Sequence, residues 1–170
     1  MKNRSLAGAT LLALSVCCVN TVIAETCYNV EGAVQTINVS SNVQVGDVDL
    51  ILSDAAGVVV LAESGSISGN ITGNDGFGTI YLSHTVRLAQ GDSFVTSNDR
   101  AQLVYPFVRN VEADGTACSY WIHETIDNIV NGTRFFRNVS SAEIFADGYI
   151  SNCSTENENY FDLSGRICLQ

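Results

Sequence analysis

His84 and Asp99 are the two residues whose types and spacing best suit chemistry in this chain. They lie on opposite arms of a predicted β-hairpin, 77–105, whose turn is Gly91-Asp92. A two-residue loop there pairs His84 with Asp99, and strand alternation places both on the inward face. A carboxylate beside an imidazole fixes its tautomer and raises its basicity, which suits a general base. The sequence therefore predicts His84 and Asp99 as catalytic residues; the alternative is a buried polar pair that holds strand register.

A metal centre and a serine nucleophile are the other chemistries that such residues could join. A metal site would add His123 or Glu124 to His84 and Asp99, but these two are adjacent and point to opposite faces of a strand. The chain contains no Cys-x-x-Cys, no close histidine pair, no Asp-x-Asp-x-Asp-Gly loop and no Gly-x-Ser-x-Gly elbow. We therefore predict no metal and no cofactor.

Aromatic residues gather around one predicted hairpin, at Trp121, Tyr120, Phe135 and Phe136. Such rings can stack on a sugar or an aromatic ligand, and Glu124 lies on the same predicted strand as Tyr120 and Trp121. We predict Trp121, Tyr120 and Glu124 as ligand-binding residues. The alternative is that the aromatic rings fill the core or cover a barrel end.

Short runs rich in Val, Ile, Thr and aromatics, separated by Gly, Asn, Asp and Ser, predict an all-β chain. No linker divides it, so residues 25–170 are expected to form a single domain. The strand spacing suits a barrel or a β-sandwich, and alternation alone does not decide between the two. The predicted strands are 27–39, 47–53, 57–63, 66–72, 77–89, 94–105, 118–130, 141–152 and 158–168.

Four cysteines follow residue 25, and an even number in an exported chain indicates two disulfides. Cys27 begins the first predicted strand and Cys168 ends the last, so they meet if these strands are antiparallel neighbours. Cys118 and Cys153 lie on two strands that pair around a loop. We predict the bonds Cys27–Cys168 and Cys118–Cys153. If Cys118 points outward, alternation places His123 on the inward face of its strand. This conflicts with the opposite face being the more apolar one, and a bulge would resolve the conflict.

The first 24 residues have the pattern of a cleaved signal peptide. Lys2 and Arg4 precede an uncharged run, 6–19, and Val22-Ile23-Ala24 offers a small residue for cleavage. The run is too short to span a bilayer comfortably. We predict cleavage after Ala24 and a bacterial periplasmic or extracellular protein without a membrane span after processing.

The expected mature chain is strongly acidic. It keeps six arginines and no lysine against 18 acidic residues, a net charge of −12. The lack of lysine excludes Schiff-base chemistry on a side chain. The negative charge argues against nucleic acid and anionic membranes as partners.

Several stretches resemble a known family. They are Leu82-Ser83-His84-Thr85, Gly91-Asp92-Ser93 with Phe94-Val95-Thr96, Asp99, Glu124-Thr125-Ile126, Gly132-Thr133-Arg134-Phe135 and Leu163-Ser164-Gly165-Arg166-Ile167-Cys168. Together they resemble bacterial secreted proteins similar to the allene oxide cyclase and dirigent barrels. The resemblance implies an antiparallel eight-stranded barrel of calycin or dirigent-like type with a central cavity, and a β-sandwich is the alternative. Plant members cyclise a fatty-acid-derived epoxide or guide the coupling of phenolic radicals there.

The chain departs from this family in two respects. Arg134 stands at the second glycine of the family's Gly-x-Gly-x-Phe turn, and the catalytic residues of the plant enzymes have no match here. We therefore expect a non-enzymatic exported barrel that binds a small, largely apolar ligand. The alternatives are a cyclase- or isomerase-like enzyme that uses His84 and Asp99, and a cell-surface β-sandwich interaction module.

Overall fold

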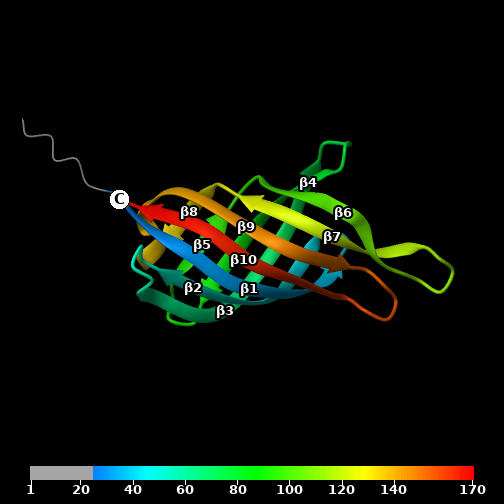
Figure 1. Cartoon of the computed structure of the whole chain (residues 1–170), viewed down its shortest axis with the longest axis horizontal. Coiled ribbons are helices and arrows are strands. Elements are labelled where there is room, and N and C mark those ends of the chain that lie inside the picture. Colours follow the sequence, from blue (N-terminus) through cyan, green and yellow to red (C-terminus); the bar gives the residue numbers. More distant parts are fainter. Residues whose placement is uncertain (1–24) are drawn as a thin grey trace, which may run out of the picture.

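Alternating apolar and polar residues run along almost the whole of residues 25–170, the part of the chain that the computed structural model describes. Alternation at a period of two gives each strand one buried and one exposed face, so these residues fold almost entirely into strands (Figure 1). The elements are β1 (Thr26–Ser40), β2 (Val43–Ser53), β3 (Val59–Asn74), β4 (Thr79–Leu88), β5 (Ser93–Thr96), β6 (Asp99–Val111), β7 (Ala117–Ile126), β8 (Ile129–Thr133), the 3₁₀ helix η1 (Arg134–Asn138), β9 (Val139–Ser151) and β10 (Glu158–Leu169).

Eight of these strands close into a ring, in the order β1, β2, β3, β4, β6, β7, β9 and β10, with β10 paired to β1. All pairings are antiparallel; the ring closes where the first and last strands, β1 and β10, pair, and the β3–β4 ladder makes it continuous. The short strands β5 and β8 extend the sheet beside β4. The predicted eight-stranded antiparallel barrel is therefore confirmed, and the closed ring excludes the sandwich. The predicted signal peptide, 1–24, lies outside the described residues.

The 3₁₀ helix covers one end of the barrel, and two hairpins extend beyond the other. At the end where β1 begins, η1 contributes Phe136, which is 1% exposed and lies 4.8 Å from Phe94 between ring centroids. At the opposite end the β6–β7 and β9–β10 hairpins extend beyond the barrel (Figure 1). Residues 25–170 include no helix of the length and hydrophobicity that crossing a membrane would require.

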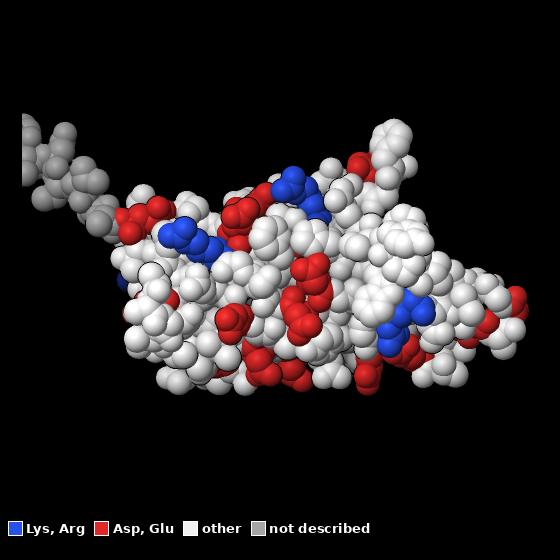
Figure 2. Space-filling model, viewed as in Figure 1, with Lys and Arg blue, Asp and Glu red and all other residues white. Residues whose placement is uncertain are grey.

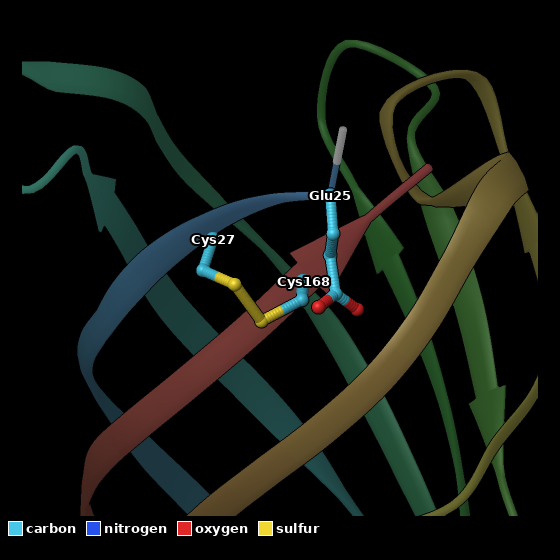
Figure 3. Close-up of side chains that lie close together, drawn as sticks. All are labelled: Glu25, Cys27 and Cys168. Atoms are coloured by element: carbon cyan, nitrogen blue, oxygen red, sulfur yellow. A yellow bond between two sulfur atoms is a disulfide. The ribbon is translucent and has the colours of Figure 1, made fainter. Parts of the chain in front are cut away.

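Both predicted disulfides are present, and they tie opposite ends of the barrel. Cys27 and Cys168 are direct partners in the β1–β10 ladder, where the ring closes, with Cα atoms 4.0 Å apart. Figure 3 shows this bond with the Glu25 side chain beside it. Cys118 and Cys153, with Cα atoms 4.8 Å apart, join the start of β7 to the loop after β9.

The prediction that an outward Cys118 turns His123 inward is wrong. Cys118 is buried on the same face of β7 as Glu124, while His123 lies on the outer face. The β7–β9 register runs without a bulge from Ser119 to Ile126, so regular alternation explains the arrangement.

Four of the predicted strands are wrong in their limits. The segments 57–63 and 66–72 form one strand, β3. The segment 94–105 is divided into β5 and β6 by a turn at Asn98, where φ is +60°. The segment 118–130 is likewise divided into β7 and β8.

The predicted register of the 77–105 hairpin is also wrong. Arg87 pairs with Ser93, and Leu82 rather than His84 pairs with Asp99. The cause is Asp92, which was expected to form a two-residue turn with Gly91. Its side chain instead turns inward and accepts a hydrogen bond from the Phe135 backbone N–H at 2.8 Å, so the connection is longer.

The two disulfides give a prediction about stability. The Cys27–Cys168 bond, removed by Cys27→Ser with Cys168→Ser, links residues that are 141 positions apart. The Cys118–Cys153 bond links residues that are 35 positions apart. Loop-closure entropy predicts losses of about 5 and about 4 kcal/mol of unfolding free energy respectively. Urea unfolding of both double variants measures the order. A larger loss on removing Cys118–Cys153 would contradict the view that the β1–β10 bond is the principal closure.

Candidate functional site in the barrel interior

The barrel encloses a largely apolar cavity. Its volume is about 50 Å³, measured as the space open to the centre of a water molecule, which is room for roughly four waters. Polar side chains line only part of the wall, namely Thr36, Gln44, His84, Thr96 and Glu124. A second interior cavity, of about 30 Å³ on the same measure, also has Gln44 and Glu124 in its wall.

His84 and Asp99 are in contact despite the different register. Asp99 begins β6 directly after the Asn98 turn and is 0% exposed. The His84 Nδ1 atom lies 2.8 Å from Asp99 Oδ2, so an imidazole with its proton on Nδ1 donates to the carboxylate. The Thr96 hydroxyl donates to the same oxygen and accepts the His84 backbone N–H at 2.9 Å. The contact that the sequence predicted is confirmed, and Thr96 supports it from β5.

Glu124 completes a buried cluster of three ionisable residues on β4, β6 and β7. Its Oε1 atom lies 3.5 Å from His84 Nδ1, and the residue is 5% exposed. Among the described residues, neither Glu124 Oε1 nor Asp99 Oδ1 has a hydrogen-bond partner. An unsatisfied buried polar atom costs free energy, about 1–3 kcal/mol for a neutral group and more for a charged one. The cluster therefore presents acceptor atoms that are not satisfied within the protein.

The surroundings shift the pKa values of His84 and Glu124 upward. Burial alone would lower the pKa of His84, but the charge of Glu124 and the hydrogen bond and charge of Asp99 together raise it above 6.5. Burial raises the pKa of Glu124 above 4.5, opposed by the charge of His84 and reinforced by that of Asp99. Both shifts favour proton uptake by the folded state.

Gly69 on β3 gives the imidazole its room. It is the ladder partner of His84, and a Cβ atom there would lie 3.0 Å from both Nε2 and Cδ2 of the ring. Any side chain at this position would displace the imidazole. Because Nδ1 is directed to Asp99, Nε2 is the ring atom left for a ligand.

The same three side chains are those that could hold a metal ion. Their ligand atoms lie within 4.8 Å of one another, and the 2.8 and 3.5 Å separations from Nδ1 are compatible with a shared ion. The other two groups of this kind contain disulfide-bonded cysteines, which are not free to bind metal. The absence of metal stays a prediction of the sequence.

The three predicted ligand-binding residues do not form one site. Tyr120 and Glu124 lie on the inward face of β7, whereas Trp121 is on the outer face and 38% exposed. Neighbours on a strand point to opposite faces, so Tyr120 and Trp121 cannot share a ligand on one side of the wall. The alternative, that aromatic rings fill the core, holds for Phe136.

Sequence reasoning missed Thr96, Gly69 and Gln44. Uninterrupted alternation from Thr96 to Asp99 would put the two on opposite faces, and the turn at Asn98 is what brings them together. A glycine within a predicted strand signals a close approach, which could have identified Gly69.

Comparisons with protein-family models, curated proteins and solved structures found no match. Kinship with the allene oxide cyclase and dirigent barrels therefore stays a prediction.

The raised pKa values predict how stability changes with pH. The folded state binds protons more tightly at both groups, so its stability falls as pH rises, from about 4.5 for Glu124 and about 6.5 for His84. Glu124→Gln removes one of the two titrating groups and also the negative charge that helps to raise the pKa of His84. As pH rises from 5 to 8, we expect the unfolding free energy of the variant to increase by at least about 1 kcal/mol relative to that of the native protein.

Urea unfolding at several pH values measures this difference. Glu31→Gln, which changes an exposed glutamate on β1, is the matched control and should leave the pH dependence unchanged. Parallel pH profiles for the native protein and Glu124→Gln would show that the cluster does not take up protons in the way described.

Proposed function

We propose that this protein binds a small, largely apolar ligand that carries a hydrogen-bond donor, and that the ligand lies inside the barrel. The observation that carries the proposal is the unsatisfied Oε1 atom of Glu124, a residue in the wall of a largely apolar cavity. A carboxylate oxygen accepts hydrogen bonds, so the ligand group that relieves its burial is a hydroxyl or an amine. The apolar wall then holds the rest of the molecule.

The end of the barrel opposite η1 offers a route to the cavity. A hollow of about 360 Å³ there is lined by Asn38, Ser40, Gln44 and Asn152, among others. Gln44 borders this hollow and both interior cavities, which supports a passage between them. The small interior volume limits the ligand to a few non-hydrogen atoms unless side chains move.

An oxidising compartment is the proposed place of action. Two disulfides persist where thiols are not kept reduced, such as the periplasm or the outside of a cell. The signal-like pattern of the first 24 residues supports export.

A second candidate function is acid–base catalysis of a cyclisation or isomerisation. Asp99 holds Nδ1 of His84, so Nε2 could take a proton from one atom of a bound substrate and return it to another. Glu124, with its raised pKa, could supply a proton to a developing anion. The arrangement supports this function less directly, because it fixes no substrate and no position for a reacting atom.

Native mass spectrometry tests the binding proposal. For protein purified from an oxidising periplasm, we expect an extra mass of one small molecule that is lost on denaturation. Ala146→Leu adds volume to the cavity wall and should abolish the extra mass. Val60→Leu, on an exposed position of β3, is the control and should retain it.

Two results would contradict the proposal: a bare polypeptide in the native protein, or an extra mass that survives in a folded Ala146→Leu variant. The released molecule also separates the two functions. Chemical conversion of it by the native protein, but not by His84→Gln, would favour the enzyme.

A further inference from the structure

A second hollow lies on the outer wall of the barrel, over β6, β7, β9 and β10. It has a volume of about 500 Å³ and is separated from the interior by the sheet. Acidic side chains gather on this face over β9 and β10 (Figure 2). We call this hollow the outer groove. Its aromatic and acidic lining side chains are Tyr105, Trp121, Tyr149, Tyr160, Asp147 and Asp162.

Aromatic rings form one row across the outer groove. Trp121, Tyr149 and Tyr160 are direct ladder partners on β7, β9 and β10. The rings of Trp121 and Tyr149 have centroids 6.0 Å apart and planes at 86°, and those of Tyr149 and Tyr160 are 6.5 Å apart at 31°. Tyr105, 82% exposed, comes from the part of β6 that leaves its register with β7. The rings therefore approach a guest from several directions, as a cage does.

Two carboxylates form a parallel row beside the rings, two residues along the same strands. Asp147 and Asp162 are direct ladder partners, and like charges placed opposite each other on neighbouring strands destabilise a sheet. His123 Nδ1 lies 2.6 Å from Asp147, and the Tyr160 hydroxyl donates to Asp162 at 2.7 Å. Within residues 25–170 no arginine forms an ion pair with either aspartate. A cation in the groove would relieve this repulsion.

One ring of the row already holds a cation. The Arg109 guanidinium carbon lies 3.6 Å from the centroid of Tyr149, with the side chain tied to Glu156 by a 2.8 Å ion pair. Cation–π attraction needs an electron-rich ring face, and the groove has three more aromatic side chains besides Tyr149.

We propose that the outer groove binds an organic cation, a ligand that carries an alkylated or quaternary ammonium group. Several aromatic rings beside paired carboxylates match the way proteins surround such groups. A saccharide is the weaker match, because it carries no positive charge to offset the two carboxylates. This proposal is independent of the interior ligand, since the sheet lies between the two sites.

Trp121 is the only tryptophan of the chain, so its fluorescence reports on the groove directly. We expect choline to change the emission with saturation and a Kd below about 10 mM. The neutral carbon analogue of choline, with a tert-butyl group in place of trimethylammonium, should bind at least about fivefold more weakly. Asp147→Asn with Asp162→Asn should weaken choline by about fivefold or more. Asp47→Asn, an exposed position on β2 outside the groove, should leave it unchanged.

Three outcomes would overturn the proposal. Equal binding of choline and its neutral analogue would make the groove a simple apolar surface. A response to cellobiose without a response to choline would make it a saccharide site. The lack of any saturable response to choline would remove the cation site. The comparison of choline with its analogue uses the native protein, so it decides the question even if the double variant does not fold.

Discussion

The interior of this barrel is organised around a buried contact between His84 and Asp99, with Glu124 beside it. Placing three ionisable groups in an apolar interior is costly unless they neutralise or satisfy one another. The surrounding chain meets this demand locally. Thr96 donates to Asp99, the Asn98 turn brings Asp99 to the start of β6, and Gly69 leaves space for the imidazole. Two acceptor oxygens remain unsatisfied, Asp99 Oδ1 and Glu124 Oε1, and Glu124 is part of the cavity wall.

Strand alternation divides the molecule into two chemically different surfaces. On β7 the inward face presents Glu124 to the cavity, while the outward face presents Trp121 to the outer groove. The closed ring keeps these surfaces apart, and the disulfide between Cys27 and Cys168 fastens the strands at which the ring closes. One wall can thus serve an interior site and an exterior site independently.

The sequence was sufficient for the features that depend on composition and alternation. The all-β class and both disulfides follow from strand periodicity and cysteine spacing. The barrel is what the family resemblance implies, and the His84–Asp99 contact is present although the predicted register is wrong. Register was not predictable in the same way, because it depends on where single side chains turn. Asp92 bonds to the backbone of Phe135 from 43 residues away, and this long-range contact sets the hairpin. The place of Glu124 beside His84 likewise depends on how β4, β6 and β7 align, which no local pattern encodes.

Nitrogen-15 NMR of the His84 imidazole tests the central claim most directly. The chain has two histidines, so His123→Gln assigns the remaining signals to His84. The account predicts a proton on Nδ1, bonded to Asp99 and protected from exchange with solvent by burial. A neutral imidazole with its proton on Nε2, or an Nδ1 proton that exchanges as fast as that of an exposed histidine, would contradict it.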